Sequence, residues 1–312
     1  MSIVLIFSGQ GHQHADMLRW LSEDPSIAAM RASLDVSDWR AALTDPAWAR
    51  ANANAQVLIT ATSLAAWSQL APHFASASIA VDGIAGYSVG ELAACAAAGV
   101  VSPGDAIHLA RQRAAFMDEA GRRLPGGLSG VTGLSRADLE AVLVDTPVTV
   151  AIRNGEDSVV VGGPVDDRTD RAATLETVEA RATARGGRCT RLAVSVASHT
   201  PLMRAAAEAF EMALGSVDMQ APATALFRSD GQRVWSTDQA RAGLARQIAS
   251  TVRWDEVMDQ LAARSPSCVL EIGGGQALAR LWQQRHPGIP ARSADEFRTL
   301  DGVVAWCGRC AA

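Results

Sequence analysis

A serine lies in a spacing that is typical of a covalent nucleophile. Ser88 is the centre of Gly86-Tyr87-Ser88-Val89-Gly90, which follows an apolar stretch and precedes an Ala-rich one. In a nucleophile elbow the serine sits on a strained turn between a strand and a helix, and small residues on both sides let the chain pass close to itself. The free N–H groups at the helix start can also hold an oxyanion. The pattern predicts nucleophilic chemistry at Ser88; the alternative is a serine that only caps the helix.

A glycine-rich turn follows the first apolar stretch of the chain. Residues 3–7 are continuously apolar, as in a strand buried on both faces of a parallel sheet, and Gly9-Gln10-Gly11 follows at once. Such a turn lies at the carboxyl end of the sheet, where open α/β folds bind ligands. One of its N–H groups and the N–H of Val89 together predict an oxyanion hole. His12 and His14 lack a third ligand at a useful spacing, so no metal site is predicted.

An arginine interrupts the apolar stripe of a predicted helix. Within residues 106–117, Arg113 falls between Leu109 and Phe116 on the apolar side, whereas Arg111 points elsewhere and is expected in solvent. A guanidinium that faces inward is costly unless it meets an anion. Arg113 therefore either pairs with a buried Asp or Glu or faces a cavity that receives an anionic substrate.

A histidine lies at a predicted junction between a strand and a helix. Residues 191–196 read as a strand, and Thr200 and Pro201 are a fitting N-cap and first residue for a helix over 202–214. The positive helix end beside His199 favours its neutral form, which can accept a proton. His199 is thus either a catalytic base or a structural hydrogen-bonding group.

The elements that must position these residues read as a small unit inserted into a larger one. The middle of the chain follows the β-α-β-β-α-β order of the ferredoxin-like fold. Its strands are predicted over 127–133, 148–153, 158–162 and 188–194, and its helices over 136–144 and 166–185. We therefore expect an α/β protein with an α/β-hydrolase-like large domain, built on a parallel sheet from residues 1–125 and 195–312. Residues 126–194 form the inserted ferredoxin-like small subdomain.

Composition excludes several classes of function. The chain has 312 residues, of which 48% are hydrophobic, and this is ample for a large core. The net charge of -5, without a basic block, argues against nucleic acid as a partner. None of the 28 basic residues is Lys, so lysine Schiff-base chemistry is excluded.

The same survey predicts a cytoplasmic protein. The most apolar region, 79–101, is interrupted by Asp82 and Glu91 and does not fit a membrane span, and the first seven residues lack the basic region of a signal peptide. Five cysteines, an odd number, fit a reducing compartment. Cys307 and Cys310 form a C-x-x-C pair at what reads as a frayed terminus, without a second pair to complete a zinc site.

Taken together, these residues resemble the malonyl-CoA:acyl-carrier-protein transacylase family over nearly the full length. The matching motifs are Gly9-Gln10-Gly11, Gly86-x-Ser88-x-Gly90-Glu91, Arg113 with Phe116-Met117, Ser198-His199, and Gln247 followed by Val252-x-Trp254. Within the family the chain is most similar to the epsilon subunit of malonate decarboxylase, on the basis of Tyr87, the segment 196–202 and the tail 290–297. The chain departs from the usual pattern at three positions. Ser8 and Thr251 replace Pro, and Tyr87 stands where the fatty-acid branch has His.

The resemblance implies a ping-pong acyl transfer that uses malonyl-CoA and no bound cofactor. By the family pattern, His199 deprotonates Ser88, and the N–H groups of Gln10 and Val89 form the oxyanion hole. Arg113 pairs with the free carboxylate of the malonyl group, and the backbone carbonyl of Gln247 orients the histidine. The acceptor is the thiol of an acyl carrier protein. For malonate decarboxylase this is a small carrier subunit with a phosphoribosyl-dephospho-CoA arm, a CoA-derived prosthetic group.

Three other functions fit parts of the sequence. A fatty-acid or polyketide malonyl transacylase uses the same catalytic residues with a different carrier. A serine thioesterase is disfavoured by Arg113 and by the absence of a convincing triad acid between Ser88 and His199. An inactive subunit that only docks a carrier is disfavoured by the intact Ser88, His199 and Arg113.

Overall fold

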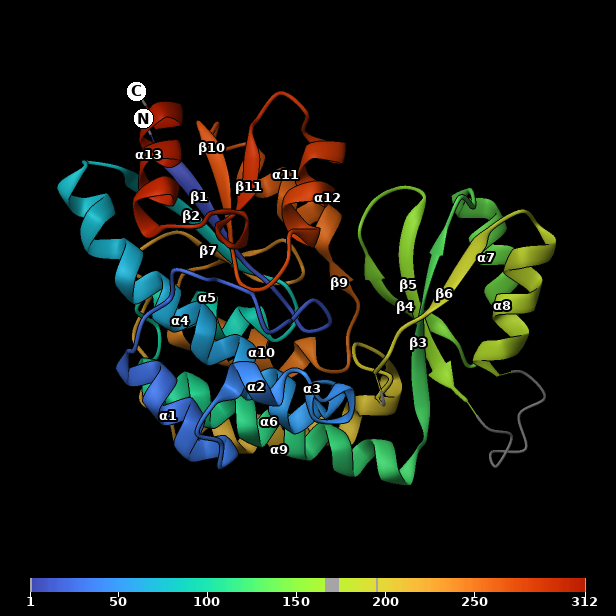
Figure 1. Ribbon diagram of the computed structural model, residues 1–312. Helices are drawn as coiled ribbons and strands as arrows, with labels where there is room; N and C mark the ends of the chain where they lie inside the picture. Colours follow the sequence, from blue (N-terminus) through green and yellow to red (C-terminus); the bar gives the residue numbers. More distant parts are fainter. Residues whose placement is uncertain (1, 166–173, 195, 312) are drawn as a thin grey trace.

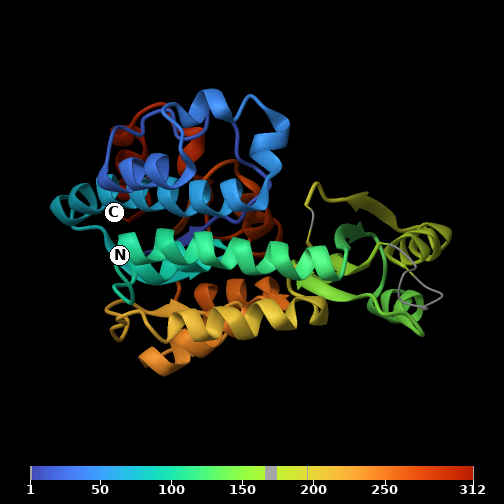
Figure 2. The ribbon, with the colours of Figure 1, turned by 90° about the horizontal axis from the view of Figure 1, so that it is seen from below.

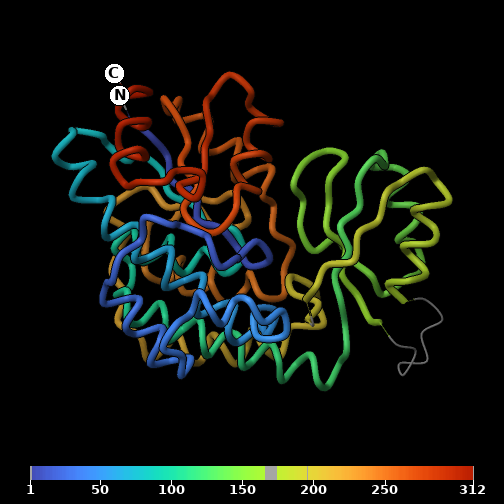
Figure 3. The backbone as a smooth tube through the Cα atoms, viewed as in Figure 1, coloured from blue at the N-terminus to red at the C-terminus, as the bar shows by residue number. Residues whose placement is uncertain are grey.

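The computed structural model describes residues 2–165, 174–194 and 196–311, which form two parts built on two separate sheets (Figure 1). The first sheet has six strands in the order β11-β10-β1-β2-β7-β8, and the second has five in the order β6-β3-β5-β4-β9. The chain is therefore a mixed α/β protein. Figure 3 follows the backbone from the first part into the second and back again.

The first sheet is parallel except at its edge strand β8. Its strands are β1 (Ser2–Phe7), β2 (Ala80–Gly86), β7 (Leu226–Phe227), β8 (Arg233–Val234), β10 (Cys268–Ile272) and β11 (Ala291–Ser293). Successive residues of β1 alternate between the two apolar cores that cover the sheet. Ile3, Leu5 and Phe7 belong to one core, and Val4 and Ile6 to the other. Burial on both faces explains why the sequence of β1 is continuously apolar.

Helices cover both faces of this sheet (Figures 1 and 2). The helices on one side include α4 (Asn52–Ser76), α5 (Gly90–Ala97), α6 (Pro103–Arg123) and α13 (Leu300–Ala311). The other side is covered by α11 (Trp254–Ala262) and α12 (Ala277–Arg285). The remaining helices of the first part are α1 (Pro25–Leu34), α2 (Trp39–Ala42), α3 (Pro46–Arg50), α9 (Arg204–Leu214) and α10 (Thr237–Gln247), with the 3-10 turns η1 (Pro201–Met203) and η2 (Ala294–Glu296).

The second sheet has helices on one face and packs its other face against the first part. Its strands are β3 (Gly126–Thr132), β4 (Thr149–Arg153), β5 (Ser158–Pro164), β6 (Arg188–Arg191) and β9 (Val252–Arg253), and its helices are α7 (Arg136–Leu143) and α8 (Leu175–Ala184). One face contacts α7 and α8 through an apolar core of its own. The opposite face contributes Leu128, Ile152 and Val160 to the core that also contains Trp254 and Met258 of α11. The two parts are thus joined by buried apolar contacts.

The segment 126–194 contains the strands and helices in the predicted order, β3-α7-β4-β5-α8-β6. The strand predicted over 191–196 is wrong for the described residues of that range, and the strand predicted over 188–194 is confirmed only in its first half, because β6 ends at Arg191. Leu192 and Val194 are apolar because they pack into the core between the two parts, and not because they continue the strand. The first half of the helix predicted over 166–185 lies outside the described residues, and the second half is α8.

Two further predictions are corrected at helix ends. The helix expected from 202 begins with the 3-10 turn η1, and its α-helical part, α9, starts at Arg204. The carboxyl-terminal segment is not frayed: it forms α13, whose Val303, Trp306 and Cys307 are buried against the first sheet. In the part of the chain that the structure describes, no helix combines the length and the apolar character needed to traverse a bilayer.

Candidate active site

Ser88 lies on a sharp turn between β2 and α5, at the carboxyl edge of the first sheet. Its φ angle of 54° is in the left-handed region, which non-glycine residues seldom adopt. The glycines on both sides are required by packing. A Cβ on Gly86 would lie 2.2 Å from backbone atoms of Gly90, and a Cβ on Gly90 would lie 2.4 Å from the carbonyl oxygen of Phe7. The G-x-S-x-G spacing therefore reflects a turn too tight for larger residues.

His199 lies beside this serine, although 111 positions separate them in the sequence. Its Nε2 is 2.9 Å from Ser88 Oγ, and its Nδ1 is 2.7 Å from the carbonyl oxygen of Gln247. A carbonyl oxygen can only accept, so Nδ1 carries the proton and donates to Gln247. Nε2 is then left as the acceptor for the serine hydroxyl. The backbone N–H of His199 also donates to the carbonyl of Ile248, at 2.8 Å, and this fixes the position of the residue.

The environment keeps His199 neutral. Burial and, to a smaller extent, the positive charge of Arg113 lower the pKa of His199 to about 3, although the hydrogen bond to Gln247 opposes both effects. A neutral imidazole is the form that can take a proton from a hydroxyl. The sequence predicted this neutrality from a nearby helix end, but the causes of the lowered pKa are burial first and Arg113 second.

The turn after β1 packs directly on the serine. A Cβ on Gly9 would lie 2.8 Å from the carbonyl oxygen of Tyr87 and 3.6 Å from Ser88 Cβ, so this glycine lets the two turns touch. β1 and β2 are parallel neighbours, and their last residues, Phe7 and Gly86, are paired. Among the described residues, the backbone N–H groups of Gln10 and Val89 have no hydrogen-bond partner. Both N–H groups therefore remain available to an oxyanion.

Arg113 is buried, with only 2% of its surface exposed, whereas Arg111 is exposed as predicted. Its guanidinium donates to two side-chain amides: to Gln56 Oε1 at 2.6 Å and to Gln247 Oε1 at 2.9 Å. No described carboxylate forms an ion pair with it. Of the two readings left open by the sequence, direct pairing with a buried Asp or Glu is therefore wrong for the described residues. Burial lowers the pKa of Arg113 to about 10, so it remains charged near neutral pH.

The sequence assigned no role to three residues of this site, although one of them, Glu91, belongs to the serine motif. Gln56, Glu91 and Ser229 are all buried and hydrogen-bonded within a network centred on Gln247. Glu91 accepts from Ser229 Oγ and from Gln247 Nε2, and burial raises its pKa. Gln56 and Glu91 had a signal, because each is a polar residue within an apolar helical stretch. Ser229 lies in a loop and had none.

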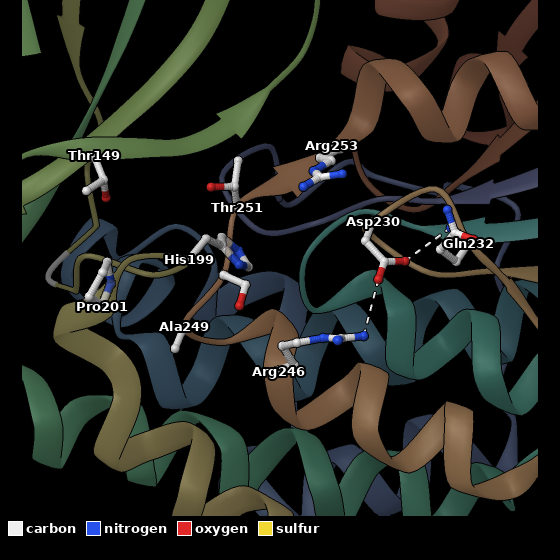
Figure 4. A pocket seen from close by; sticks show the side chains of 10 residues that line it. Thr149, His199, Pro201, Asp230, Gln232, Arg246, Ala249, Thr251 and Arg253 are labelled. Carbon is white, nitrogen blue, oxygen red and sulfur yellow. Dashed lines mark hydrogen bonds and ion pairs between the residues drawn. The ribbon is translucent and has the colours of Figure 1, made fainter. Parts of the chain in front are cut away.

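A cavity of about 480 Å³ gives access to His199 (Figure 4). It is lined by Thr149 of β4 in the second sheet, by Ser250 and by Arg253 of β9, the strand that the segment after α10 adds to that sheet. Arg246 also lines it and pairs with Asp230 at 3.3 Å. The cavity is large enough for a narrow, extended ligand.

Tyr87 connects the serine turn to the second sheet. Its hydroxyl donates to Asn154 Oδ1 at 3.1 Å, in the loop between β4 and β5. Its ring lies edge-on to Trp254, with 5.3 Å between the ring centres. The residue next to the nucleophile therefore takes part in the contact between the two parts.

Taken together, the geometry can support covalent acyl transfer. The serine has an acceptor for its proton, two N–H groups on the neighbouring turns have no hydrogen-bond partner among the described residues, and a buried cation there has no carboxylate partner. Such a cation favours an acyl group that carries its own negative charge.

Comparison with known proteins agrees with this chemistry. The model of the acyl transferase domain family matches residues 4–285. The malonyl CoA-acyl carrier protein transacylase of Mycobacterium tuberculosis (strain ATCC 25618 / H37Rv) is 32% identical over 308 residues, which cover 97% of this chain and 99% of that protein.

Solved structures show the same likeness. The malonyl-CoA:acyl carrier protein transacylase of Xanthomonas oryzae pv. oryzae superimposes with a TM-score of 0.87 at 28% identity, covering 97% of this chain and 98% of the other. A malonyl-transacylase in complex with a holo type II PKS acyl-carrier protein superimposes with a TM-score of 0.85 at 25% identity, covering 98% and 99%.

Proposed function

Because this chain belongs to the acyl transferase domain family, we propose that it is a malonyl-CoA:acyl-carrier-protein S-malonyltransferase. The malonyl group moves from malonyl-CoA to Ser88 and then to the thiol of an acyl carrier protein. The relatives named above carry this activity in their names, and one of them was solved with its carrier. The enzyme needs no bound cofactor for this reaction, because donor and acceptor bring their own CoA-derived arms.

In the first half-reaction, His199 Nε2 takes the proton of the Ser88 hydroxyl as the oxygen attacks the thioester carbonyl. The N–H groups of Gln10 and Val89 donate to the oxyanion of the tetrahedral intermediate. When the carbon–sulfur bond breaks, the imidazolium returns the proton to the CoA sulfur. In the second half-reaction the carrier thiol gives its proton to His199 and attacks the seryl ester, and the proton then returns to Ser88.

The observation that carries the proposal is the set of partners of Arg113. Two neutral amides hold the guanidinium in place without neutralising it. The malonyl carboxylate can complete the arrangement with a bidentate ion pair, which is geometrically selective. An acetyl group lacks this carboxylate and leaves the cation buried and unpaired, at a cost of about 1–3 kcal/mol. We therefore expect the enzyme to prefer malonyl over acetyl by at least about tenfold.

Replacing Arg113 tests this assignment. Arg113→Ala should lower kcat/KM for malonyl transfer by about 10²-fold, while acetyl transfer holds or rises, because the variant has no unpaired cation to bury. Arg113→Lys should restore little, since an ammonium cannot form the two parallel hydrogen bonds. The measurement is the rate of carrier acylation with malonyl-CoA and with acetyl-CoA. The exposed Arg111→Ala, on the same helix, is the matched control and should change neither rate. Equal losses of both activities with a lower Tm would instead give Arg113 a structural role.

For the acceptor, we propose the carrier subunit of malonate decarboxylase. The support is sequence resemblance: Tyr87 before the serine, the segment 196–202 and the tail 290–297 match the epsilon subunit of that enzyme. Fatty-acid or polyketide carriers are the alternative, and the relatives' names fit that alternative. For the fold, we propose that the first sheet is α/β-hydrolase-like and the second ferredoxin-like. The strand orders of the two sheets support these descriptions.

Competition between two carriers separates these acceptors. The malonylated enzyme is offered equal amounts of a carrier with a phosphoribosyl-dephospho-CoA arm and a carrier with a phosphopantetheine arm. We expect at least about tenfold faster transfer to the former, a discrimination of about 1.4 kcal/mol. Mass spectrometry of both carriers over time gives the two rates. A preference for the phosphopantetheine carrier would assign the enzyme to fatty-acid or polyketide synthesis, and rapid hydrolysis without any carrier would indicate a thioesterase.

A further inference from the structure

The Gln247 side chain stands between two buried groups of opposite charge. Its Oε1 accepts from Arg113 at 2.9 Å, and its Nε2 donates to Glu91 Oε2 at 2.5 Å. Arg113 and Glu91 are each only 2% exposed. The cation and the nearest carboxylate are therefore joined through one neutral amide, and not by direct contact.

The partners of Gln247 allow only one orientation of its amide. Besides Glu91, the Nε2 group faces the carbonyl oxygen of Ser88 at 2.9 Å and Ser229 Oγ at 3.0 Å. The Ser229 hydroxyl donates its proton to Glu91 and is therefore an acceptor toward Gln247. Three acceptors on one side fix the NH₂ group there, so the oxygen must face Arg113.

Without this amide, the two charges would attract each other. Opposite charges in a buried, poorly solvated region interact far more strongly than they do in water. A direct pair with Glu91 would neutralise the charge that a substrate carboxylate would otherwise bind. Glu91 does not depend on such a pair, because the N–H and hydroxyl of Ser229 already hydrogen-bond to it.

We propose that the Gln247 side chain determines specificity as a neutral spacer that prevents Arg113 from pairing with Glu91. It keeps the guanidinium charged, oriented and free for the carboxylate of the acyl group. This inference rests on the proposed malonyl transfer. This role of the side chain is separate from the role of the backbone of the same residue, whose carbonyl oxygen holds His199. A substitution of the side chain leaves that carbonyl in place, so the two roles can be tested apart.

The test compares the ratio of malonyl to acetyl transfer in four proteins: the native enzyme, Gln247→Ala, Glu91→Gln, and the double variant. Gln247→Ala opens the space for an Arg113–Glu91 pair, so the ratio of kcat/KM values should fall by at least about tenfold. In the double variant no carboxylate remains to capture Arg113, and the ratio should return to within about threefold of the native value. Glu91→Gln alone should keep the ratio within the same range.

Each outcome decides the proposal. An unchanged ratio in Gln247→Ala overturns it. A lowered ratio that Glu91→Gln fails to restore in the double variant also overturns it, because the loss then comes only from the missing hydrogen bond to Arg113. If the alanine variant does not fold, Gln247→Asn in the same two backgrounds gives the same comparison, since the shorter amide cannot reach both groups. The ratio of the native enzyme tests the proposed function separately, because a native enzyme without malonyl preference would contradict that function itself.

Discussion

Ser88→Ala should abolish both the covalent malonyl adduct and transfer to the carrier, lowering the rate by at least about 10³-fold. The hydroxyl oxygen is the only group of Ser88 that the reaction uses, and it is 2.9 Å from the base. Alanine tolerates the left-handed backbone at this position about as well as serine, so the fold should persist. Mass spectrometry of the intact protein after exposure to malonyl-CoA checks the adduct, and carrier acylation checks the rate.

Ser250→Ala is the matched control for this variant. Ser250 lines the cavity that reaches His199, but its side chain makes no hydrogen bond with Ser88 or His199 among the described residues. The Ser250→Ala variant should still form the malonyl adduct on Ser88 and should retain most of the rate of carrier acylation. An adduct that survives in Ser88→Ala, or that moves to another residue, would show that a different group carries the acyl chain.

The second prediction with a large effect concerns His199, the proposed general base. His199→Ala should slow acylation by about 10²–10⁴-fold, the usual contribution of a positioned general base. The measurement is the pre-steady-state rate of CoA release from malonyl-CoA. A variant with a near-normal rate would leave His199 with a structural role, in keeping with its buried hydrogen bonds to Gln247 and Ile248.

The pH dependence of the native enzyme gives the control for this prediction. A base acts only when it is unprotonated, and an ordinary histidine would lose this form below about pH 6.5. Because burial and then Arg113 lower the pKa of His199 to about 3, acylation should stay constant from about pH 8 to about pH 5 and fall only at more acid pH. Arg113→Ala removes one of the two causes and should shift the acid limb to higher pH. A native profile that falls near pH 6.5 would contradict the neutral, desolvated state of His199.

The sequence predicted the residues whose signals are local. Ser88 lies between two glycines that a tight turn requires, Arg113 interrupts an apolar helical stripe, and His199 precedes a Thr-Pro helix start. Each of these signals arises from backbone geometry or periodicity within a few residues. The order of elements in the segment 126–194 was predictable for the same reason, because alternation and helical spacing are local properties.

The rest of the site depends on contacts between distant elements. Gln56 on α4 and Glu91 on α5 meet the arginine network only through the packing of α4, α5 and α6. A polar residue in an apolar stretch signals a buried polar group but does not show which partner it will meet. The same limit explains the strand wrongly extended beyond Arg191. Apolar residues at alternate positions fit a strand, but Leu192 and Val194 instead fill the core between the two parts. Whether an apolar residue pairs in a sheet or only covers it is decided by tertiary structure.

The short strand β9 couples the position of His199 to the position of the second sheet. The stretch from Gln247 to Trp254 starts at the carbonyl that holds the base, and Thr251 Oγ1 donates to the carbonyl of Val150 at 2.7 Å. It continues as β9, which pairs in parallel with β4 of the second sheet, and ends at the tryptophan that contacts Tyr87. One continuous stretch of chain thus links the carbonyl that holds His199 to the second sheet. A displacement of the second sheet relative to the first would therefore also displace the carbonyl that holds His199. We therefore expect the distance between Ser88 Oγ and His199 Nε2 to depend on the relative position of the two sheets.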